Sequence, residues 1–277
     1  MRAYVIGDPV KHSLSPAIHN AAYQHCGIPA TFATHEVSSE ELAGFMADLP
    51  ADLLGLAVTM PHKQAIFAHV DAVEPLAQAV GAINTVVACA NVRTGFNTDV
   101  YGIAQALIEA AGSDPDFAAG APAVILGARA TASSALAALG QLHVGPISVV
   151  ARNFGGAGSI SLAQTRLGVQ TTPIPWRDQK AVHAALSQAR VVVSTVPATV
   201  ADVWAPQLRI GQDAIILDAA YHPWPSKLAE AGQALGARIC SGHDMLLHQA
   251  CQQFTLMTGQ AAPVEVMRQA LQAALVN

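Results

Sequence analysis

The stretch from Val124 to Leu139, VILGARATASSALAAL, decides the fold class of this chain. An apolar run ends in Gly127, and a run of small, helix-compatible residues follows at once. This order is typical of the first strand, turn and helix of a dinucleotide-binding domain, where glycine permits a tight turn. The usual pattern has a second glycine two residues later, but this chain has Arg129 there. The stretch therefore predicts an α/β domain with an altered phosphate loop.

Short apolar runs on both sides of this loop alternate with helical sequence, as in an α/β fold. The continuous Val/Ile runs indicate strands buried on both faces of a parallel sheet. We therefore predict a Rossmann-like, doubly wound domain over residues 103–242. Its strands read PAVILG, ISVVAR, RVVVSTV, AIILDA and RICSG.

The N-terminal part has the same rhythm, with strand-like AYVIG, TFATHEV and LLGLAVTM each followed by helical sequence. It predicts an α/β domain with a largely parallel sheet, in which Ser38 and Glu41 have the spacing of a capping box. The helical patterns HDMLLHQACQQFTLMTG and PVEVMRQALQAALV come late and should return to it. The first domain is then 1–102 plus 243–277, the segment 112–122 is a linker or loop, and a small-molecule cleft is expected between the domains.

Composition excludes several classes of protein. The chain has 277 residues, of which 52% are hydrophobic and 12% charged, and a net charge of -5 that gives no reason to expect nucleic acid. No uncharged apolar run reaches the roughly 18 residues of a membrane span, and the N-terminus does not read as a signal peptide. Four scattered cysteines favour the cytoplasm over a disulfide or zinc framework, and eleven histidines show no metal-ligand spacing.

Charge around the glycine loop bears on the cofactor. An NAD site commonly has an acidic residue about 20 residues after the first glycine, but no Asp or Glu occurs from Phe117 to Arg177. The same stretch carries Arg129, Arg152, Arg166 and Arg177. If a dinucleotide binds, this pattern favours NADP, because arginine pairs with a 2′-phosphate. The alternative is a strand-turn-helix without a ligand, in which Arg152 is a solvated charge.

Several polar residues of the first domain are candidates for chemistry. Ser13 and Ser15 lie two apart and could hold a carboxylate, although Ser15 before Pro16 also reads as a helix N-cap. Pro61 predicts a helix start, which puts Lys63 in the first turn, where the helix dipole disfavours a cation. Lys63 is thus a candidate proton-transfer group, with a solvent-facing lysine as the equal alternative.

Three further motifs carry polar groups. Asn97, Thr98 and Asp99 precede an amphipathic helix, and one of them should be its N-cap. Asn84 lies in a strand-like run, where its amide requires a partner. Tyr221 follows a predicted strand end.

Taken together, these motifs resemble the shikimate dehydrogenase family nearly from end to end. The resemblance rests on their order and spacing. The matching segments are GDPVKHSLSPAIHN, VTMPHK, GAINTVV, GFNTD, VILGA, VVARN, LDAAYHPWPSKLAEAG and SGHDMLLHQA.

The resemblance implies reversible, NADPH-dependent reduction of 3-dehydroshikimate to shikimate in aromatic amino-acid biosynthesis, by a monomer or homodimer. It implies Lys63 and Asp99 as the catalytic pair, and Ser13 and Ser15 as ligands of the substrate carboxylate. Other substrate contacts would be Thr59, Asn84, Tyr221 and Gln249. Ala219 and Gly242 would lie by the nicotinamide, and the remaining cofactor residues would be Gly127, Ala128, Arg129, Ala130, Thr131, Arg152, Asn153 and Thr195.

Two departures from the family pattern stand out. Arg129 replaces a loop glycine, and Ala57 replaces an asparagine. VVARN also lacks the further arginine that many members have a few residues later. The alternatives are a quinate/shikimate dehydrogenase with relaxed cofactor choice, or a non-catalytic small-molecule-binding protein that has lost the cofactor.

Overall fold

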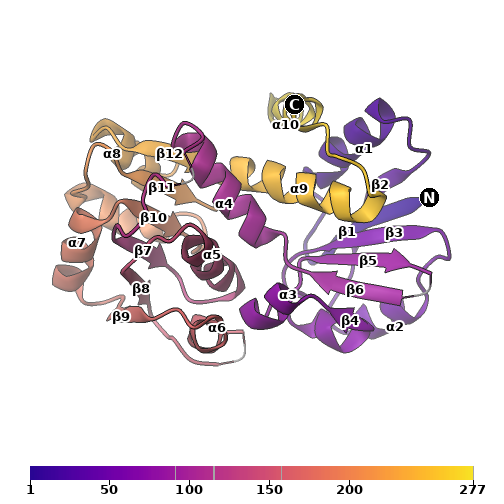
Figure 1. Ribbon diagram of the computed structural model, residues 1–277, viewed down its shortest axis with the longest axis horizontal. Helices are drawn as coiled ribbons and strands as arrows, with labels where there is room; N and C mark the ends of the chain where they lie inside the picture. Colours follow the sequence, from indigo (N-terminus) through magenta and orange to yellow (C-terminus); the bar gives the residue numbers. More distant parts are fainter. Residues whose placement is uncertain (91, 115, 157, 277) are drawn as a thin grey trace. The chain divides into compact units, whose positions relative to one another are not determined.

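The computed structural model describes residues 1–90, 92–114, 116–156 and 158–276, and its elements are labelled in Figure 1. The chain forms two compact units, one of Met1–Thr98 with Leu246–Asn277 and the other of Asp99–Met245. The boundaries expected from the sequence, at 102/103 and 242/243, lie within four residues of these. Residue 277, which the sequence assigned to the first domain, lies outside the described residues.

The first unit is built on a mixed six-stranded sheet of order β2-β1-β3-β5-β6-β4. We expected a largely parallel sheet, but β5 runs antiparallel to both β3 and β6. Only two residues separate β5 from β6, which is too short for a parallel crossover. The strands are β1 (Arg2–Gly7), β2 (Thr31–Glu36), β3 (Leu53–Val58), β4 (Ala72–Val73), β5 (Thr85–Cys89) and β6 (Val92–Phe96).

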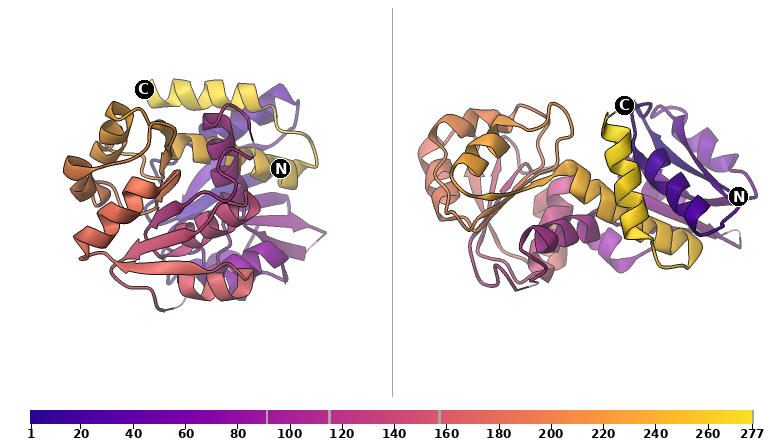
Figure 2. Two further views of the ribbon diagram at one scale, coloured as in Figure 1. Left: turned by 60° about the vertical axis from the view of Figure 1, so that its left-hand side comes forward. Right: turned by 90° about the horizontal axis from the view of Figure 1, so that it is seen from above.

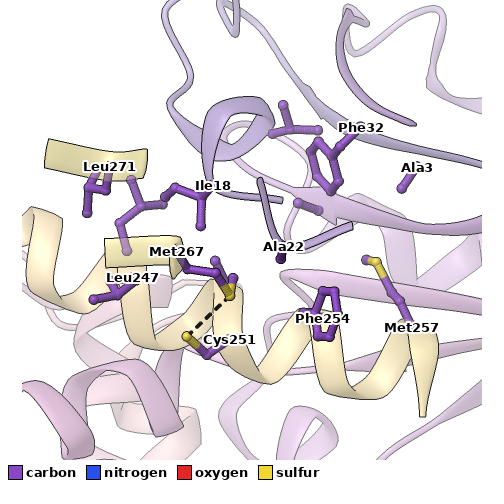
Figure 3. Close-up of a cluster of buried hydrophobic side chains, with 14 of the residues drawn as sticks. Ala3, Ile18, Ala22, Phe32, Leu247, Cys251, Phe254, Met257, Met267 and Leu271 are labelled. Atoms are coloured by element: carbon purple, nitrogen blue, oxygen red, sulfur yellow. Dashed lines mark hydrogen bonds between the residues drawn. The ribbon is translucent and has the colours of Figure 1, made fainter. Parts of the chain in front are cut away.

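Helices cover both faces of this sheet. On one face, Ala3 and Phe32 pack against α1 (Ser15–His25), α9 (Gly242–Thr258) and α10 (Val264–Val276) in the buried cluster drawn in Figure 3. Figure 2 shows α10 lying beside α1. The return of the C-terminal helices to the first domain is thus confirmed. The other face packs against α2 (Leu42–Ala47), the 3₁₀ helix η1 (Ala65–His69) and α3 (Pro75–Val80).

The second unit is a doubly wound, all-parallel sheet of order β12-β11-β10-β7-β8-β9. Strands β7, β10 and β11 are buried along their whole length, which confirms the prediction from their Val/Ile runs. The strands are β7 (Ala123–Leu126), β8 (Ile147–Ala151), β9 (Thr171–Pro175), β10 (Val191–Ser194), β11 (Ile215–Asp218) and β12 (Arg238–Ser241). The helices are α4 (Asp99–Ala110), α5 (Ala130–Gln141), α6 (Ile160–Leu167), α7 (Gln179–Gln188), η2 (Ala201–Gln207) and α8 (Lys227–Ala234).

The chain order of these strands reverses between β7 and β10, and ligands of such sheets bind beyond the carboxyl ends at that point. Strand β9 was missed from the sequence because Pro173 and Pro175 argue against a strand, but its place at the sheet edge tolerates proline. The segment 112–122, apart from residue 115 outside the described residues, is a loop between α4 and β7. It lies inside the second unit and does not link the two units.

Two predictions about helix ends have different outcomes. Ser38 and Glu41 exchange the two hydrogen bonds of a capping box, at 2.9 and 3.3 Å, as predicted. The N-cap predicted at Ser15 is wrong, because α1 already begins there. Its backbone N–H donates instead to the Ser13 hydroxyl at 3.3 Å, so Ser13 satisfies the first turn.

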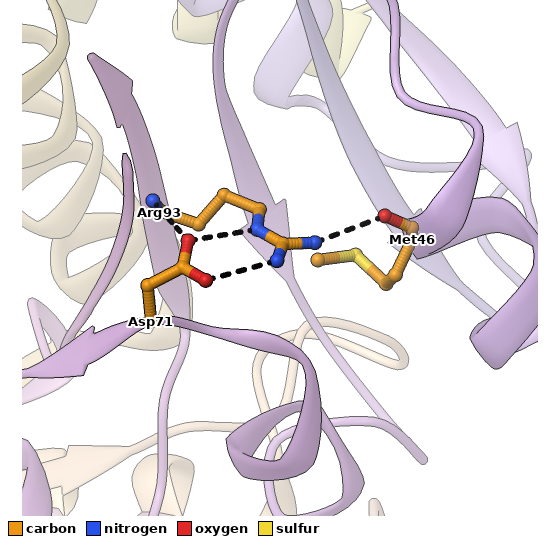
Figure 4. A network of polar contacts seen from close by, with 3 residues as sticks. All are labelled: Met46, Asp71 and Arg93. Atoms are coloured by element: carbon orange, nitrogen blue, oxygen red, sulfur yellow. Dashed lines mark hydrogen bonds and ion pairs between the residues drawn. The ribbon is translucent and has the colours of Figure 1, made fainter. Parts of the chain in front are cut away.

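A charged contact closes the β4–β6 edge of the first sheet (Figure 4). Arg93 Nε and Nη2 each donate to the Asp71 carboxylate at 3.0 Å, and Arg93 Nη1 donates to Met46 O at 3.1 Å. Hydrogen bonds from the Arg93 side chain and backbone lower the pKa of Asp71 from 3.8 to about 2. Both groups are solvent-accessible, so the contact fastens an edge and contributes little to total stability.

We predict that Asp71→Asn lowers the urea midpoint of unfolding slightly at pH 7 and that this difference disappears near pH 2. The folded pKa is depressed, so the stabilisation is present above the ordinary carboxyl pKa and is lost as the pH falls towards about 2. Equilibrium urea unfolding of both proteins across this range measures the effect. Glu40→Gln removes an exposed carboxylate elsewhere and serves as the control. A deficit of Asp71→Asn that stays constant down to pH 2 would contradict this account.

Candidate active site

A buried layer of amides and hydroxyls crosses the first unit, centred on Asn84 just before β5. The Asn84 Oδ1 accepts from Thr98 N at 2.7 Å and from the Thr85 hydroxyl at 2.9 Å. Its Nδ2 donates to Thr98 Oγ1 at 2.9 Å and to Gln249 Oε1 at 3.3 Å. Asn84 therefore connects β5, the residue before α4 and helix α9. The prediction that its amide has hydrogen-bond partners is confirmed.

Helix α9 supplies a second amide to this layer, and sequence reasoning missed it. Gln253 Nε2 donates to Thr85 Oγ1 at 3.0 Å and to Asn84 O at 3.3 Å. Its Oε1 lies 3.3 Å from His19 Nε2, and burial lowers the pKa of His19 to about 4. The neutral His19 thus donates and fixes the Gln253 amide. The available signal was the i, i+4 spacing of Gln249 and Gln253, which puts both on one helix face.

The carboxyl ends of β1 and β3 bring the predicted hydroxyls to one edge of the sheet. Ser13 and Ser15 lie in and after the loop that follows β1, and Thr59 follows β3 directly. Because β1 and β3 are parallel neighbours, these groups lie at the same edge. Thr59 packs closely on the end of β1, since a Cβ on Gly7 would lie 2.4 Å from Thr59 Cγ2.

The structure corrects the local account of Lys63. Residues 60–64 form a turn and η1 begins only at Ala65, so Lys63 is not in the first turn of an α-helix. The cause is tertiary, because Lys63 O accepts from Ile83 N at 2.8 Å, beside Asn84. Buried His62 anchors the same turn through Nε2, 2.6 Å from Val37 O. The helix-dipole argument therefore fails, but the backbone places Lys63 next to the Asn84 layer.

In the second unit, Asp99 is the first residue of α4, where the helix dipole favours a carboxylate. Helix α4 runs antiparallel to β12, since Arg238 Nη1 donates to Ala110 O at 3.0 Å and Cys240 Sγ to Ala106 O at 3.3 Å. Its first turn therefore lies towards the carboxyl end of β12. Thr98 is the N-cap position of α4, because it directly precedes the first helical residue, Asp99. Its hydroxyl accepts a hydrogen bond from Asn84 Nδ2 and so belongs to the Asn84 layer.

Ala219, Tyr221 and Gly242 gather beyond β11 and β12. A Cβ on Gly242 would lie 2.6 Å from Ala219 O and 3.0 Å from Tyr221 Cδ1, so only glycine fits without a shift. Tyr221 as a whole exposes 48% of its surface, whereas its hydroxyl lies in crowded surroundings. Burial of that hydroxyl, and then the negative charge of Asp99, raise the pKa of Tyr221. The phenol and the carboxylate thus lie within electrostatic reach of each other.

The glycine loop lies where the strand order reverses. Gly127 has φ +117°, and a Cβ there would lie 2.3 Å from Thr195 Oγ1, which donates to Leu126 O at 3.0 Å. The first hydrogen bond of α5 runs from Ser133 N to Arg129 O, so the amides of residues 130–132 have no acceptor inside the helix. Ala128, which follows Gly127, is buried. These features fit a pyrophosphate approaching bare backbone at a helix N-terminus.

The arginines of this region are exposed. Arg152 and Asn153 follow β8, and Asn153 Oδ1 accepts from Gly155 N at 2.9 Å, which shapes the loop. Arg129 is the N-cap residue of α5, but its side chain caps nothing and reaches Gly155 O at 3.5 Å. The structure thus brings Arg129 to the loop that carries Arg152. This arrangement fits a phosphorylated ribose better than a free ribose hydroxyl.

Other kinds of site find no support in the described part of the chain. Among residues 1–90, 92–114, 116–156 and 158–276, no three His, Cys, Asp or Glu side chains gather as metal ligands. Within the same residues, each helix is too short or too polar to cross a bilayer.

Comparisons with known proteins agree along the chain. The family model "Shikimate dehydrogenase substrate binding domain" matches residues 5–86, and "Shikimate 5'-dehydrogenase C-terminal domain" matches residues 242–272. The shikimate dehydrogenase (NADP(+)) of Moorella thermoacetica is 35% identical over 98% of this chain and 92% of its own length.

Solved structures give the same result. Mycobacterium tuberculosis shikimate dehydrogenase superposes with a TM-score of 0.85 at 38% identity, covering 98% of both chains. The shikimate 5-dehydrogenase of Thermus thermophilus, solved with NADP(H) and shikimate, superposes with a TM-score of 0.83 at 28% identity, covering 99% of both. The chain belongs to the shikimate dehydrogenase family.

Proposed function

We propose that this protein is a shikimate dehydrogenase, which reduces 3-dehydroshikimate reversibly to shikimate with NADPH in aromatic amino-acid biosynthesis. The observation that carries the proposal is the cradle of Gly127 and Thr195 at the strand-order reversal, in a chain of this family. Gly127 keeps this turn free of a side chain, which the approach of a pyrophosphate to bare backbone requires, although the loop has lost its second glycine. The relatives named above carry the same activity in their names.

The first unit supplies groups suited to a small molecule with several hydroxyls and a carboxylate. Ser13 and Ser15 bind the carboxylate, and Thr59, Asn84 and Gln249 bind hydroxyls. Support comes from the Asn84 layer, whose amides are held in place by hydrogen bonds inside the protein. Because both Asn84 Nδ2 hydrogens are already donated, a substrate hydroxyl takes over one of these bonds. Such preorganised groups lose little freedom when substrate binds. Tyr221, whose hydroxyl lies within the electrostatic reach of Asp99, contributes a further hydroxyl contact.

Lys63 and Asp99 handle the proton of the reacting hydroxyl. The Lys63 amine gives or takes that proton, and the Asp99 carboxylate orients the hydroxyl and the amine. The backbone positions both residues. Lys63 O accepts a hydrogen bond from Ile83 N, and Asp99 is the first residue of α4. When bound, NADP accepts the hydride from shikimate and NADPH returns it to the ketone.

The second unit holds the cofactor. Gly127, Ala128, Ala130 and Thr131 present backbone to the pyrophosphate, with Thr195 packed on the turn. The nicotinamide would lie by Ala219 and Gly242, which approach each other closely beyond β11 and β12. Arg152 and Asn153 follow β8, the strand whose end meets the ribose in a doubly wound domain. The acid-free sequence from Phe117 to Arg177 supports NADP over NAD.

Two properties stay predictions. We place the protein in the cytoplasm, which the four scattered free thiols support. We expect a monomer or a homodimer that needs no nucleic acid and no membrane.

One spectrophotometric assay tests the function and its alternatives together. Shikimate and quinate are each combined with NADP and with NAD, and nicotinamide reduction is followed by absorbance. We expect shikimate with NADP to give the highest kcat/KM. Comparable rates with quinate or NAD would favour the relaxed enzyme. No hydride transfer in any combination would leave only the non-catalytic alternative.

We predict that Lys63→Ala lowers kcat by about 10²–10⁴-fold, the usual contribution of a positioned acid/base, with a much smaller change in shikimate affinity. Asp99→Asn should also lose turnover, because an amide cannot replace the carboxylate charge. Steady-state kinetics and calorimetric titration of shikimate separate the two effects. Lys180→Ala, an exposed lysine on α7, should behave as wild type. If Lys63→Ala kept more than about a tenth of kcat, Lys63 would not be the proton carrier.

We predict that Arg152→Ala raises the KM for NADP by roughly tenfold or more while changing the KM for NAD little. The guanidinium pairs only with the phosphate that distinguishes the two cofactors. Initial rates with each cofactor at saturating shikimate measure the difference. Equal losses with both cofactors would assign Arg152 to the fold or to the adenine.

A further inference from the structure

Arg129 occupies the position at which the usual loop has glycine, and its side chain takes a defined direction. The residue is the N-cap of α5, yet the guanidinium does not turn back over the first amides of the helix. It extends to the loop after β8, where Nη1 donates to Gly155 O at 3.5 Å. The pyrophosphate-facing end of α5 is therefore left to its backbone amides.

The loop after β8 accommodates this side chain through its glycines. Gly156 has φ +101°, and an ideal Cβ there would lie 3.5 Å from Arg129 Nη1. The guanidinium thus stands beside the space that a side chain at residue 156 would enter. The same loop begins with Arg152, which is exposed. Arg129 follows β7 and Arg152 follows the neighbouring strand β8, so the Arg129 guanidinium reaches the loop that Arg152 begins.

The charge around these two arginines is one-sided. No Asp or Glu occurs between Phe117 and Arg177, so the β7–β9 half of the unit carries no carboxylate from its own sequence. Arg129 makes one long hydrogen bond within the described part of the chain, and a guanidinium has five N–H donors. Most of its donors remain available to a dianionic group with several acceptor oxygens.

We propose that Arg129 is a second ligand of the 2′-phosphate of NADP, beside Arg152, and so determines the choice of NADP over NAD. The proposal rests on the NADP-dependent function above and assigns Arg129 to one group of that cofactor. In a doubly wound domain the residues that end the second strand meet the ribose 2′ position, and β8 is that strand here. Arg129 reaches this strand end, so it meets the 2′-phosphate and leaves the pyrophosphate to residues 130–132.

The experiment separates the two phosphate groups with simple probes. Adenosine 2′-monophosphate carries the 2′-phosphate without a pyrophosphate, and ADP carries a pyrophosphate without the 2′-phosphate. Calorimetry measures Kd for both probes and for NADP and NAD, with wild type, Arg129→Ala and Arg129→Lys. Arg209→Ala, which removes an exposed arginine from the loop before β11, is the charge-matched control. Because the Arg129 side chain caps no amide, its removal should leave the melting temperature unchanged.

We expect Arg129→Ala to weaken NADP and adenosine 2′-monophosphate by about tenfold and to leave ADP and NAD within about twofold. Arg129→Lys should fall between, because a point charge replaces a fork of donors. Equal weakening of ADP and adenosine 2′-monophosphate would overturn the proposal in favour of a pyrophosphate contact. Unchanged or tighter binding of NADP would overturn it too. Wild type that binds no NADP would instead refute the proposed function, before any variant is compared.

Discussion

The side-chain amide of Asn84 bonds to its neighbour Thr85 and to two separate segments of the first unit, at Thr98 and at Gln249. The placement of the candidate substrate groups of this unit depends on these bonds. The amide oxygen holds Thr98 N and the Thr85 hydroxyl, and the amide nitrogen holds Thr98 Oγ1 and Gln249 Oε1. Every partner of the Asn84 side chain is buried. Breaking one of these bonds would leave a buried polar group without a hydrogen-bond partner, which costs about 1–3 kcal/mol per group. The backbone on either side extends the constraint, since Ile83 N holds Lys63 O and Asn84 O accepts from Val58 N at 2.7 Å. The Asn84 amide thus holds Thr98 and α9, and the backbone of Ile83 and Asn84 holds the Lys63 turn and the end of β3.

In the second unit, the candidate site is shaped by glycines that let backbone segments approach closely, whereas in the first unit it is shaped by buried side-chain amides. Gly127 and Gly242 stand at strand ends where a Cβ would collide with Thr195 Oγ1 and with Ala219 O, respectively. These collisions explain why glycine persists there although the loop has lost its second glycine to Arg129. The exchange is tolerated because the Arg129 side chain leaves the turn and extends to Gly155 O. The backbone at the N-terminus of α5 therefore stays clear of the Arg129 side chain, as the proposed dinucleotide site requires.

Much of this architecture could be predicted from the sequence, because periodicity and strand-end glycines are local signals. The buried strands β7, β10 and β11 and the return of α9 and α10 are examples. The failures came where distant contacts override local preference. Lys63 lies in a turn because its carbonyl oxygen accepts a hydrogen bond from the backbone N–H of Ile83, twenty residues later. The first turn of α1 bonds to the Ser13 hydroxyl, although the sequence predicted Ser15 as the N-cap. The i, i+4 spacing puts Gln253 on one helix face with Gln249, but nothing in the local sequence indicates its partner His19, 234 residues away.

The most direct test of this account is a double-mutant cycle on the bond from Gln253 Nε2 to Thr85 Oγ1, with kcat/KM for shikimate as the readout. Gln253→Leu and Thr85→Val remove the two ends of the bond, and neither residue is itself proposed to contact substrate, although each also hydrogen-bonds to Asn84. If the buried layer positions the substrate groups as one unit, each variant lowers kcat/KM and the effects are coupled by roughly 0.5–3 kcal/mol. NADP affinity, which depends on the other unit, should stay unchanged in all three proteins. Strictly additive effects, or single variants with wild-type kcat/KM, would contradict the account.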